Sequence, residues 1–204
     1  MSALSTFAAS PLWFTTRSTG AVAFVLLTAT TVLGVAATRR SLASARWPRF
    51  ATQALHRNIS LLALLVLLVH ITTTVIDSYV NVGWLAVVVP GASAYETLPV
   101  GLGALAFDLL IVAAATGLAR GRIPLRAWRP LHLLAYAAWP LALVHFLTAG
   151  TDAGSRWSLA LAAASAAAVA GASALRLSTH ERRGPVRSLI APGHPEPRTR
   201  RSAA

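Results

Sequence analysis

The chain has 204 residues, of which 55% are hydrophobic and only 12% are charged, and its mean hydropathy is +0.61. Soluble globular domains carry about 25% charged residues, so the composition excludes an ordinary soluble domain and predicts an integral membrane protein. Basic residues number 18, all of them arginine, against 6 acidic residues. The arginines stand mostly at the ends of apolar runs and in the C-terminal part. Membrane topology explains that placement better than nucleic-acid binding does, and we expect no nucleic-acid partner.

The chain contains no cysteine. This excludes disulfides, thiolate metal sites, iron–sulfur clusters and the covalent attachment of haem. Any metal would therefore be held by histidine or carboxylate side chains, because the only methionine is Met1. The first ten residues lack the basic region of a signal peptide, so we expect residues 1–10 to be a short segment that precedes the first span.

Five apolar runs are long enough to cross a membrane as helices. In chain order they are residues 18–38, 57–77, 99–119, 130–149 and 157–176. The fold class that follows is an all-α integral membrane protein, a five-helix transmembrane bundle. We assign residues 11–176 to this membrane domain. Residues 177–204 form a basic tail that is rich in proline, arginine and serine and is expected to be disordered.

The charges of the loops alternate along the chain. Arginines fill the loop between the first two runs, the loop between the third and fourth, and the tail: Arg39, Arg40, Arg46, Arg49, Arg57, Arg120, Arg122, Arg126, Arg129, Arg182, Arg183 and Arg187. The opposite loops carry Asp77, Glu96 and Asp152 with Arg156. The positive-inside rule then predicts an N-outside, C-inside topology, with a cytoplasmic tail, in a multi-pass protein of the cell membrane.

Two of the apolar runs each contain two histidines. His56 and His70 are 14 residues apart in the second run, and His132 and His145 are 13 apart in the fourth. Ionisable residues at membrane depth are costly and mark functional sites. The two helices run in the same direction, so His56 can face His132 at one depth and His70 can face His145 at another. Two facing histidines can supply both axial ligands of a b-type haem, and two pairs would place two haems across the membrane, between the second and fourth helices.

The interval of 13 residues needs an irregular helix. At about 100° per residue, 14 residues return to within roughly 40° of the starting face, whereas 13 residues miss it by roughly 140°. Pro140 stands inside this interval, removes one backbone hydrogen bond and can kink or rewind the helix. We therefore expect the fourth helix to depart from ideal winding at Pro140.

Other readings of these polar residues stay open. The histidines can be buried structural residues that donate to serine, threonine or carbonyl groups, and a zinc or copper site is a weaker alternative because no carboxylate accompanies the pairs. Arg57 and Arg129 adjoin the inner pair, and Arg17 and Arg156 are available at the outer end, where they can bind haem propionates. Positive-inside or interfacial placement explains each arginine equally well.

A carboxylate stands midway along the third run. Asp108 must be neutral, paired or directed at a polar cavity there, and it can relay a proton, orient a ligand or tie helices together through a threonine or Tyr136. We favour the structural role, because no proton-relay chain accompanies it. Trp128, Tyr136, Trp139 and Phe146 can pack on porphyrin faces, but aromatic residues at such spacing more often pack within the bundle.

The segment from about Pro11 to Leu175 resembles the ferric reductase-like transmembrane domain. This domain is shared by ferric reductases, NADPH oxidases and the haem-binding membrane subunit of the bacterial methionine sulfoxide reductase system. The resemblance rests on the two histidine pairs with their spacings and on Trp128-Arg129-Pro130-Leu131-His132 through Ala135-Tyr136 to Trp139. The opening Leu12-Trp13-Phe14 with Arg17-Ser18-Thr19-Gly20 is similar to that of stand-alone bacterial members, particularly actinobacterial ones.

The resemblance implies two non-covalent b haems, with His56 and His132 on the inner iron and His70 and His145 on the outer iron. It also implies electron transfer from the cytoplasm outward. The family's oxidases have six spans, and the five here match the later ones. Those oxidases continue into a flavin and NADPH domain, whereas here a short basic tail without a glycine-rich nucleotide loop follows, so we expect a separate donor.

These inferences together predict a membrane cytochrome b, an electron-transfer component of oxidoreductase type without a catalytic side chain of its own. The expected donor is a flavoprotein or quinol. The expected external acceptor is a ferric chelate, a flavoprotein, a reductase subunit or oxygen, and it would be reduced at the haem edge. Two alternatives are a quinol-linked cytochrome b subunit, whose quinone pocket could include Asp108, and a haem-free membrane scaffold or transporter subunit.

Overall fold

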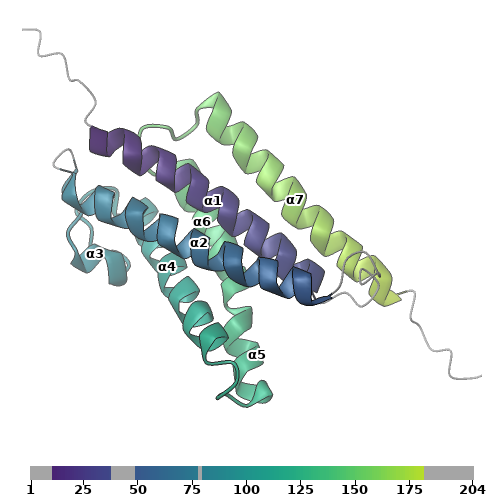
Figure 1. Cartoon of the computed structure of the whole chain (residues 1–204). Coiled ribbons are helices and arrows are strands. Elements are labelled where there is room, and N and C mark those ends of the chain that lie inside the picture. Colours follow the sequence, from purple (N-terminus) through teal and green to yellow (C-terminus); the bar gives the residue numbers. More distant parts are fainter. Residues whose placement is uncertain (1–10, 38–48, 78–79, 182–204) are drawn as a thin grey trace, which may run out of the picture.

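The computed structural model describes residues 11–37, 49–77 and 80–181 (Figure 1). The expectations for residues 1–10, for Arg39, Arg40 and Arg46, and for the tail from residue 182 onward lie outside the described residues. The elements are α1 (Pro11–Ala37), α2 (Arg49–Ile76), α3 (Leu85–Val88), α4 (Thr97–Leu118), α5 (Leu125–Leu133), α6 (Ala135–Thr148) and α7 (Arg156–Glu181). The regular structure of the described part of the chain is thus all helical, without strands. Residues 177–181, expected to belong to a disordered tail, instead continue α7.

Five helical segments are long and apolar enough to cross a membrane, which confirms the five predicted spans of a multi-pass membrane protein. They are α1, α2, α4, α7 and the segment Leu125–Thr148 formed by α5 and α6 together. The second helix begins at Arg49, eight residues earlier than predicted. Hydropathy marks only the apolar part of a helix, whereas polar residues such as Gln53 and Arg57 continue it because they are good helix formers. His56 consequently lies about two turns inside the helix.

The bundle has two ends, which we name after arginines that lie near them. At the Arg17 end, α1 begins and α2 ends, and the hydroxyl of Thr16 donates to that of Thr73 at 2.9 Å. At the same end, the backbone N–H of Gly150 donates to the carboxylate of Glu96, which joins the start of α4 to the end of α6. The opposite end, where α2 and α5 begin, is the Arg57 end.

Helix α1 lies at the centre of the bundle, between α2 and α7, and also packs against α6 (Figure 1). Its side chains Phe24 and Leu27 form the buried core together with Trp139 of α6. Phe24 stacks on Trp139, and the indole of Trp139 donates to the buried hydroxyl of Thr28 at 3.0 Å. Aromatic pairs of this kind contribute about 0.5–1.5 kcal/mol beyond their burial. Trp139 therefore serves the packing of the bundle.

The fourth span is interrupted at Leu134, between α5 and α6. There the N–H of Ala137 donates to the carbonyl of Leu134 at 3.0 Å, an i to i+3 bond that winds the chain more tightly than an α-helix does. The departure from ideal winding expected between His132 and His145 is present, but its predicted position was wrong. Pro140 lies within α6, six residues after the interruption.

Candidate functional site

The imidazole rings of the four membrane histidines form two pairs, one toward each end of the bundle. The ring centroids of His56 and His132 are 6.3 Å apart and the ring planes cross at 78°. The centroids of His70 and His145 are 6.4 Å apart at 77°. Helix α2 supplies one member of each pair, whereas α5 and α6 supply the other two. The two pairs therefore repeat one geometry at two depths.

Helix α1 holds both histidines of α2 through its backbone. The Nδ1 of His70 lies 2.9 Å from the carbonyl oxygen of Thr16, and the Nδ1 of His56 lies 3.0 Å from that of Thr30. A carbonyl can only accept, so both Nδ1 atoms carry the proton and donate. The Nε2 atom of each ring then keeps its lone pair, which is the tautomer that binds a metal.

A glycine makes each of these contacts possible. Gly20 follows Thr16 by four residues, and Gly34 follows Thr30 by four. The carbonyl of a helical residue points toward the residue four positions later, where any side chain would cover it. A Cβ built at Gly20 would lie 2.9 Å from Cε1 of His70, and one at Gly34 would lie 3.3 Å from Cε1 of His56. The absent side chains thus leave space for the imidazole rings.

The same arrangement recurs on α4. The Nδ1 of His145 donates to the carbonyl of Pro99 at 2.8 Å. Gly103, four residues after Pro99, lies against the ring, and a Cβ there would be 2.8 Å from both Cε1 and Nδ1 of His145. Three of the four histidines are therefore held by a carbonyl at position i and a glycine at position i+4 of a neighbouring helix.

His132 is held in a different way. Its ring stacks on Trp128, one turn earlier in α5, with centroids 4.7 Å apart and an interplanar angle of 17°. The guanidinium of Arg120 lies over the Trp128 ring of this stack, 4.8 Å from the ring centroid. Within the described residues, the Nδ1 of His132 and the Nε1 of Trp128 are buried and have no hydrogen-bond partner. The orientation of the His132 ring therefore depends on the stack with Trp128 and not on a hydrogen bond from Nδ1.

One continuous cavity of about 1160 Å³ connects the two histidine pairs. Its lining includes all four histidines and the three glycines that contact their rings. Single small-molecule sites typically measure about 300–1,000 Å³, so this cavity exceeds the usual size of a site for one small ligand. Aromatic residues Trp128, Tyr136 and Phe146 also line it. Trp139, which belongs to the core, does not.

The arginines named from the sequence lie at different places around this cavity. Arg57 and Arg129 line its Arg57 end, together with Arg120 and Arg176. Arg17 lines the opposite end, whereas Arg156 is exposed and does not line the cavity. The cavity thus has cationic side chains at both ends, with a larger number at the Arg57 end.

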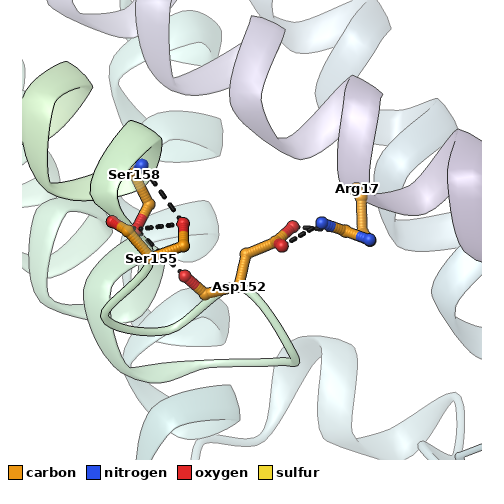
Figure 2. Close-up of polar contacts among 4 residues, drawn as sticks. All are labelled: Arg17, Asp152, Ser155 and Ser158. Atoms are coloured by element: carbon orange, nitrogen blue, oxygen red, sulfur yellow. Dashed lines mark hydrogen bonds and ion pairs between the residues drawn. The ribbon is translucent and has the colours of Figure 1, made fainter.

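Arg17 also forms an ion pair with Asp152, in the loop that leads into α7 (Figure 2). Two guanidinium nitrogens face the two carboxylate oxygens, and the same guanidinium lies 4.0 Å from the ring centroid of Trp13. Beside this pair, Ser155 caps α7 by accepting from the N–H of Ser158, whose hydroxyl donates to the carbonyl of Asp152 (Figure 2). The pair fixes the start of α1 to the start of α7.

Asp108 does not line the cavity. Its neighbours Phe107 and Leu110 do, and Leu110 is about 200° away from Asp108 around the helix. In the described part of the chain, the Asp108 carboxyl makes no hydrogen bond or ion pair, so the suggested tie to Tyr136 is absent and that prediction was wrong. The position outside the cavity also separates Asp108 from any ligand held between the histidines.

The sequence contained a sign of the supporting framework that the inspection of histidines alone missed. Thr16 and Thr30 are 14 residues apart, as are Gly20 and Gly34, and this equals the interval between His56 and His70. Because α1 and α2 run in opposite directions, the equal intervals bring each histidine of α2 against one threonine of α1 and the glycine four residues after it. No comparable spacing marks Trp128 as the support of His132.

The fold and the site define a multi-pass helical membrane protein with two histidine pairs in a shared cavity. The family model described as "Ferric reductase like transmembrane component" matches residues 19–143, more than half of the chain, and the chain belongs to this family. Membership indicates a membrane electron-transfer component. Comparison with curated proteins and with solved structures gave no match.

Proposed function

We propose that this protein is a membrane cytochrome b that binds two b haems and passes electrons across the membrane. The observation that carries the proposal is the repeated geometry of the histidine pairs, with ring centroids 6.3 and 6.4 Å apart. Bonds from a first-row metal to an imidazole nitrogen are about 2.0–2.1 Å long, so two imidazoles on opposite sides of one ion have ring centres roughly 6 Å apart. Both separations agree with one six-coordinate iron per pair.

The tautomers support the same assignment. His56, His70 and His145 each donate from Nδ1 to a backbone carbonyl, which leaves Nε2 as the nitrogen that can bind iron. Such a hydrogen bond also fixes the orientation of the ring and raises its basicity as a ligand. When bound, haem b would be held by His56 with His132 and by His70 with His145, and it would supply reversible one-electron chemistry.

A metal ion without porphyrin fits these residues less well. Among the described residues, no three histidine, cysteine, aspartate or glutamate side chains gather in a cluster that could hold a metal ion. Two isolated imidazoles give a free zinc or copper ion half of its usual four ligands. The cavity, by contrast, is large and mainly apolar around each pair, as the binding of a porphyrin requires.

The cationic side chains have a role in the proposed site. Arg57, Arg129 and Arg17 line the cavity ends, where a guanidinium can form charge-assisted hydrogen bonds with a propionate. Arg17 already binds Asp152, so it has fewer donors left than the other two.

We further propose that the Arg57 end faces the cytoplasm of a cell-membrane protein. Arg57, Arg120, Arg122, Arg126, Arg129 and Arg176 gather at this end, whereas Asp77, Glu96 and Asp152 lie at the other. The positive-inside rule favours a cytoplasmic Arg57 end. A separate cytoplasmic flavoprotein or quinol would then donate electrons at the His56 and His132 pair. An external acceptor such as a ferric chelate or a reductase subunit would be reduced near the His70 and His145 pair.

The visible spectrum of the purified protein tests the proposal. We expect a Soret band, a reduced α band of b type after dithionite, and two haem equivalents per chain. His70→Ala should remove about one equivalent, and the double variant His70→Ala/His145→Ala should remove no more, because each change destroys the same site. His56→Ala should remove the other equivalent.

The matched control is Leu65→Ala on α2. Leu65 is exposed and lies on a face of the helix that is away from the cavity and from both histidines, so this variant should retain both haem equivalents. A wild-type protein without a Soret band would refute the cytochrome assignment. Equal loss of both haems in His70→Ala and in His56→Ala would refute the proposed pairing.

A further inference from the structure

Asp108 lies in the middle of α4, eleven residues after its first residue and ten before its last. The helix is long and apolar enough to span the membrane, so the carboxyl is near the bilayer centre, where an unpaired charge is costly. Carboxyls at this depth pair with one another or with other polar groups. Among the described residues, nothing pairs with it.

None of the described arginines forms an ion pair with Asp108, and Arg17 binds Asp152 instead. Asp108 also lies outside the histidine cavity. Within the described residues, Asp108 is therefore left without a partner, and its helix face is open to a group from another molecule.

The surroundings of Asp108 have the periodicity of a helix-packing seam. Leu105, Asp108, Val112 and Ala115 follow one another at intervals of three, four and three residues, which is the heptad pattern of two helices that cross at a small angle. Leu105 is 39% and Val112 37% exposed, and Ala115 is exposed too. We call these four residues the Asp108 seam.

The Asp108 seam is covered on the side where α4 begins. One heptad before Asp108, Gly101 is buried beneath the turn at Gly91, since a Cβ on Gly101 would lie 3.0 Å from the backbone nitrogen of Gly91. Helices α5 and α6 pack on α4, and residues of its cavity side such as Phe107 face the histidines. The seam is thus a narrow outward stripe with one polar residue at its centre.

We propose that the Asp108 seam binds a second copy of this chain. A twofold axis along the membrane normal brings α4 against α4 of the other copy, and symmetry places both Asp108 side chains at the same depth. Two carboxyls at that axis satisfy each other by hydrogen bonds and a shared proton. A single polar residue in an apolar seam also fixes the register of the two helices, as buried polar residues do in coiled coils.

A second copy is favoured over a different subunit because the seam matches itself. In a parallel pair, Leu105, Val112 and Ala115 meet their own counterparts at equal depth, and no basic residue is required of the partner. A different subunit would have to bring a polar or basic residue of its own to the bilayer centre, whereas a second copy already carries Asp108 at that depth.

Cysteine cross-linking tests the seam, since the chain has no native cysteine. Val112→Cys places a thiol on the seam, and Leu62→Cys places one at similar depth on the exposed face of α2. After reconstitution at high lipid-to-protein ratio and oxidation, we expect a disulfide-linked dimer to form at least about ten times faster for Val112→Cys, as a preformed pair keeps its two thiols in contact.

The carboxyl itself is tested in the Val112→Cys background. Asp108→Leu should lower the cross-linking rate to that of Leu62→Cys, whereas Asp108→Asn, which still donates and accepts hydrogen bonds, should retain most of it. Equal rates for Val112→Cys and Leu62→Cys, or a rate that Asp108→Leu leaves unchanged, would overturn the proposal. The readout is independent of haem, so it also separates this inference from the proposed function.

Discussion

Gly103 lies so close to the imidazole of His145 that a single added methyl group would collide with it. A Cβ at Gly103 would be 2.8 Å from Cε1 and Nδ1 of the ring, and the same Nδ1 donates to Pro99 one turn earlier. Real Cβ atoms do not approach other atoms this closely, so either α4 or the ring must move. The glycine therefore determines where His145 can lie.

Gly103→Ala is expected to displace His145 and to reduce the bound haem from two equivalents to about one. The reason is steric, because the ring must leave the position opposite His70. Loss of the contacts that orient a metal-binding histidine typically costs about 10- to 100-fold in metal affinity. Haem content by pyridine haemochrome measures the loss. The matched control is Gly171→Ala in the spanning helix α7, where an added Cβ meets nothing within 4 Å and which does not line the cavity. Equal haem loss in both variants would contradict the explanation.

Trp128→Leu should weaken the haem held by His132 and leave the other haem intact. His132 has no partner at Nδ1 within the described residues and depends on the indole stack, with centroids 4.7 Å apart, for its orientation. Since aromatic stacking contributes about 0.5–1.5 kcal/mol, the expected loss of haem affinity is about 2- to 10-fold. Haem titration of the apoprotein measures it.

Two further variants make the role of Trp128 specific. Trp128→Phe retains a ring over His132 and should keep most of the affinity. Trp84→Leu, at an exposed tryptophan outside the cavity, should change neither haem. The stacking explanation fails if Trp128→Phe loses as much affinity as Trp128→Leu.

Pro140→Ala is expected to leave both haems bound. The change in winding that brings His132 and His145 onto the cavity lies at Leu134, and α6 runs continuously through Pro140. Alanine restores one backbone donor in a helix and is a better helix former, so thermal stability should not fall. Haem content and the melting temperature in detergent measure both effects. Loss of one haem equivalent would show instead that Pro140 sets the phase of the two histidines.

Asp152→Asn should lower thermal stability without any direct change to a histidine. The Arg17 and Asp152 side chains are 32% and 19% exposed, so the ion pair is neither fully solvent-exposed nor fully buried. Its loss should lower the free energy of unfolding by about 1–2 kcal/mol. Differential scanning fluorimetry in detergent measures the lower melting temperature. Arg156→Gln, at an exposed arginine four residues later, serves as the control. The charge-reversed double variant Arg17→Asp/Asp152→Arg should recover part of the loss, and a double variant no better than the sum of its singles would argue against the ion pair.

The sequence by itself determined the five spans, because the length of an apolar run is a local property that the bilayer thickness converts directly into a helix. It also determined that His56 and His70, like His132 and His145, lie in single spanning segments, and the family follows from the same stretch of chain. The starts of α1 and α2 were missed, since polar residues continue a helix beyond its apolar part.

Only the tertiary structure decided what surrounds the histidines. Carbonyl and glycine contacts such as Thr30 with Gly34 around His56 depend on the register between α1 and α2, which hydropathy along one helix does not contain. The same holds for the outward direction of Asp108 on α4 and for the interruption at Leu134. Periodicity specifies which residues share a face, but packing against neighbouring helices decides where that face points.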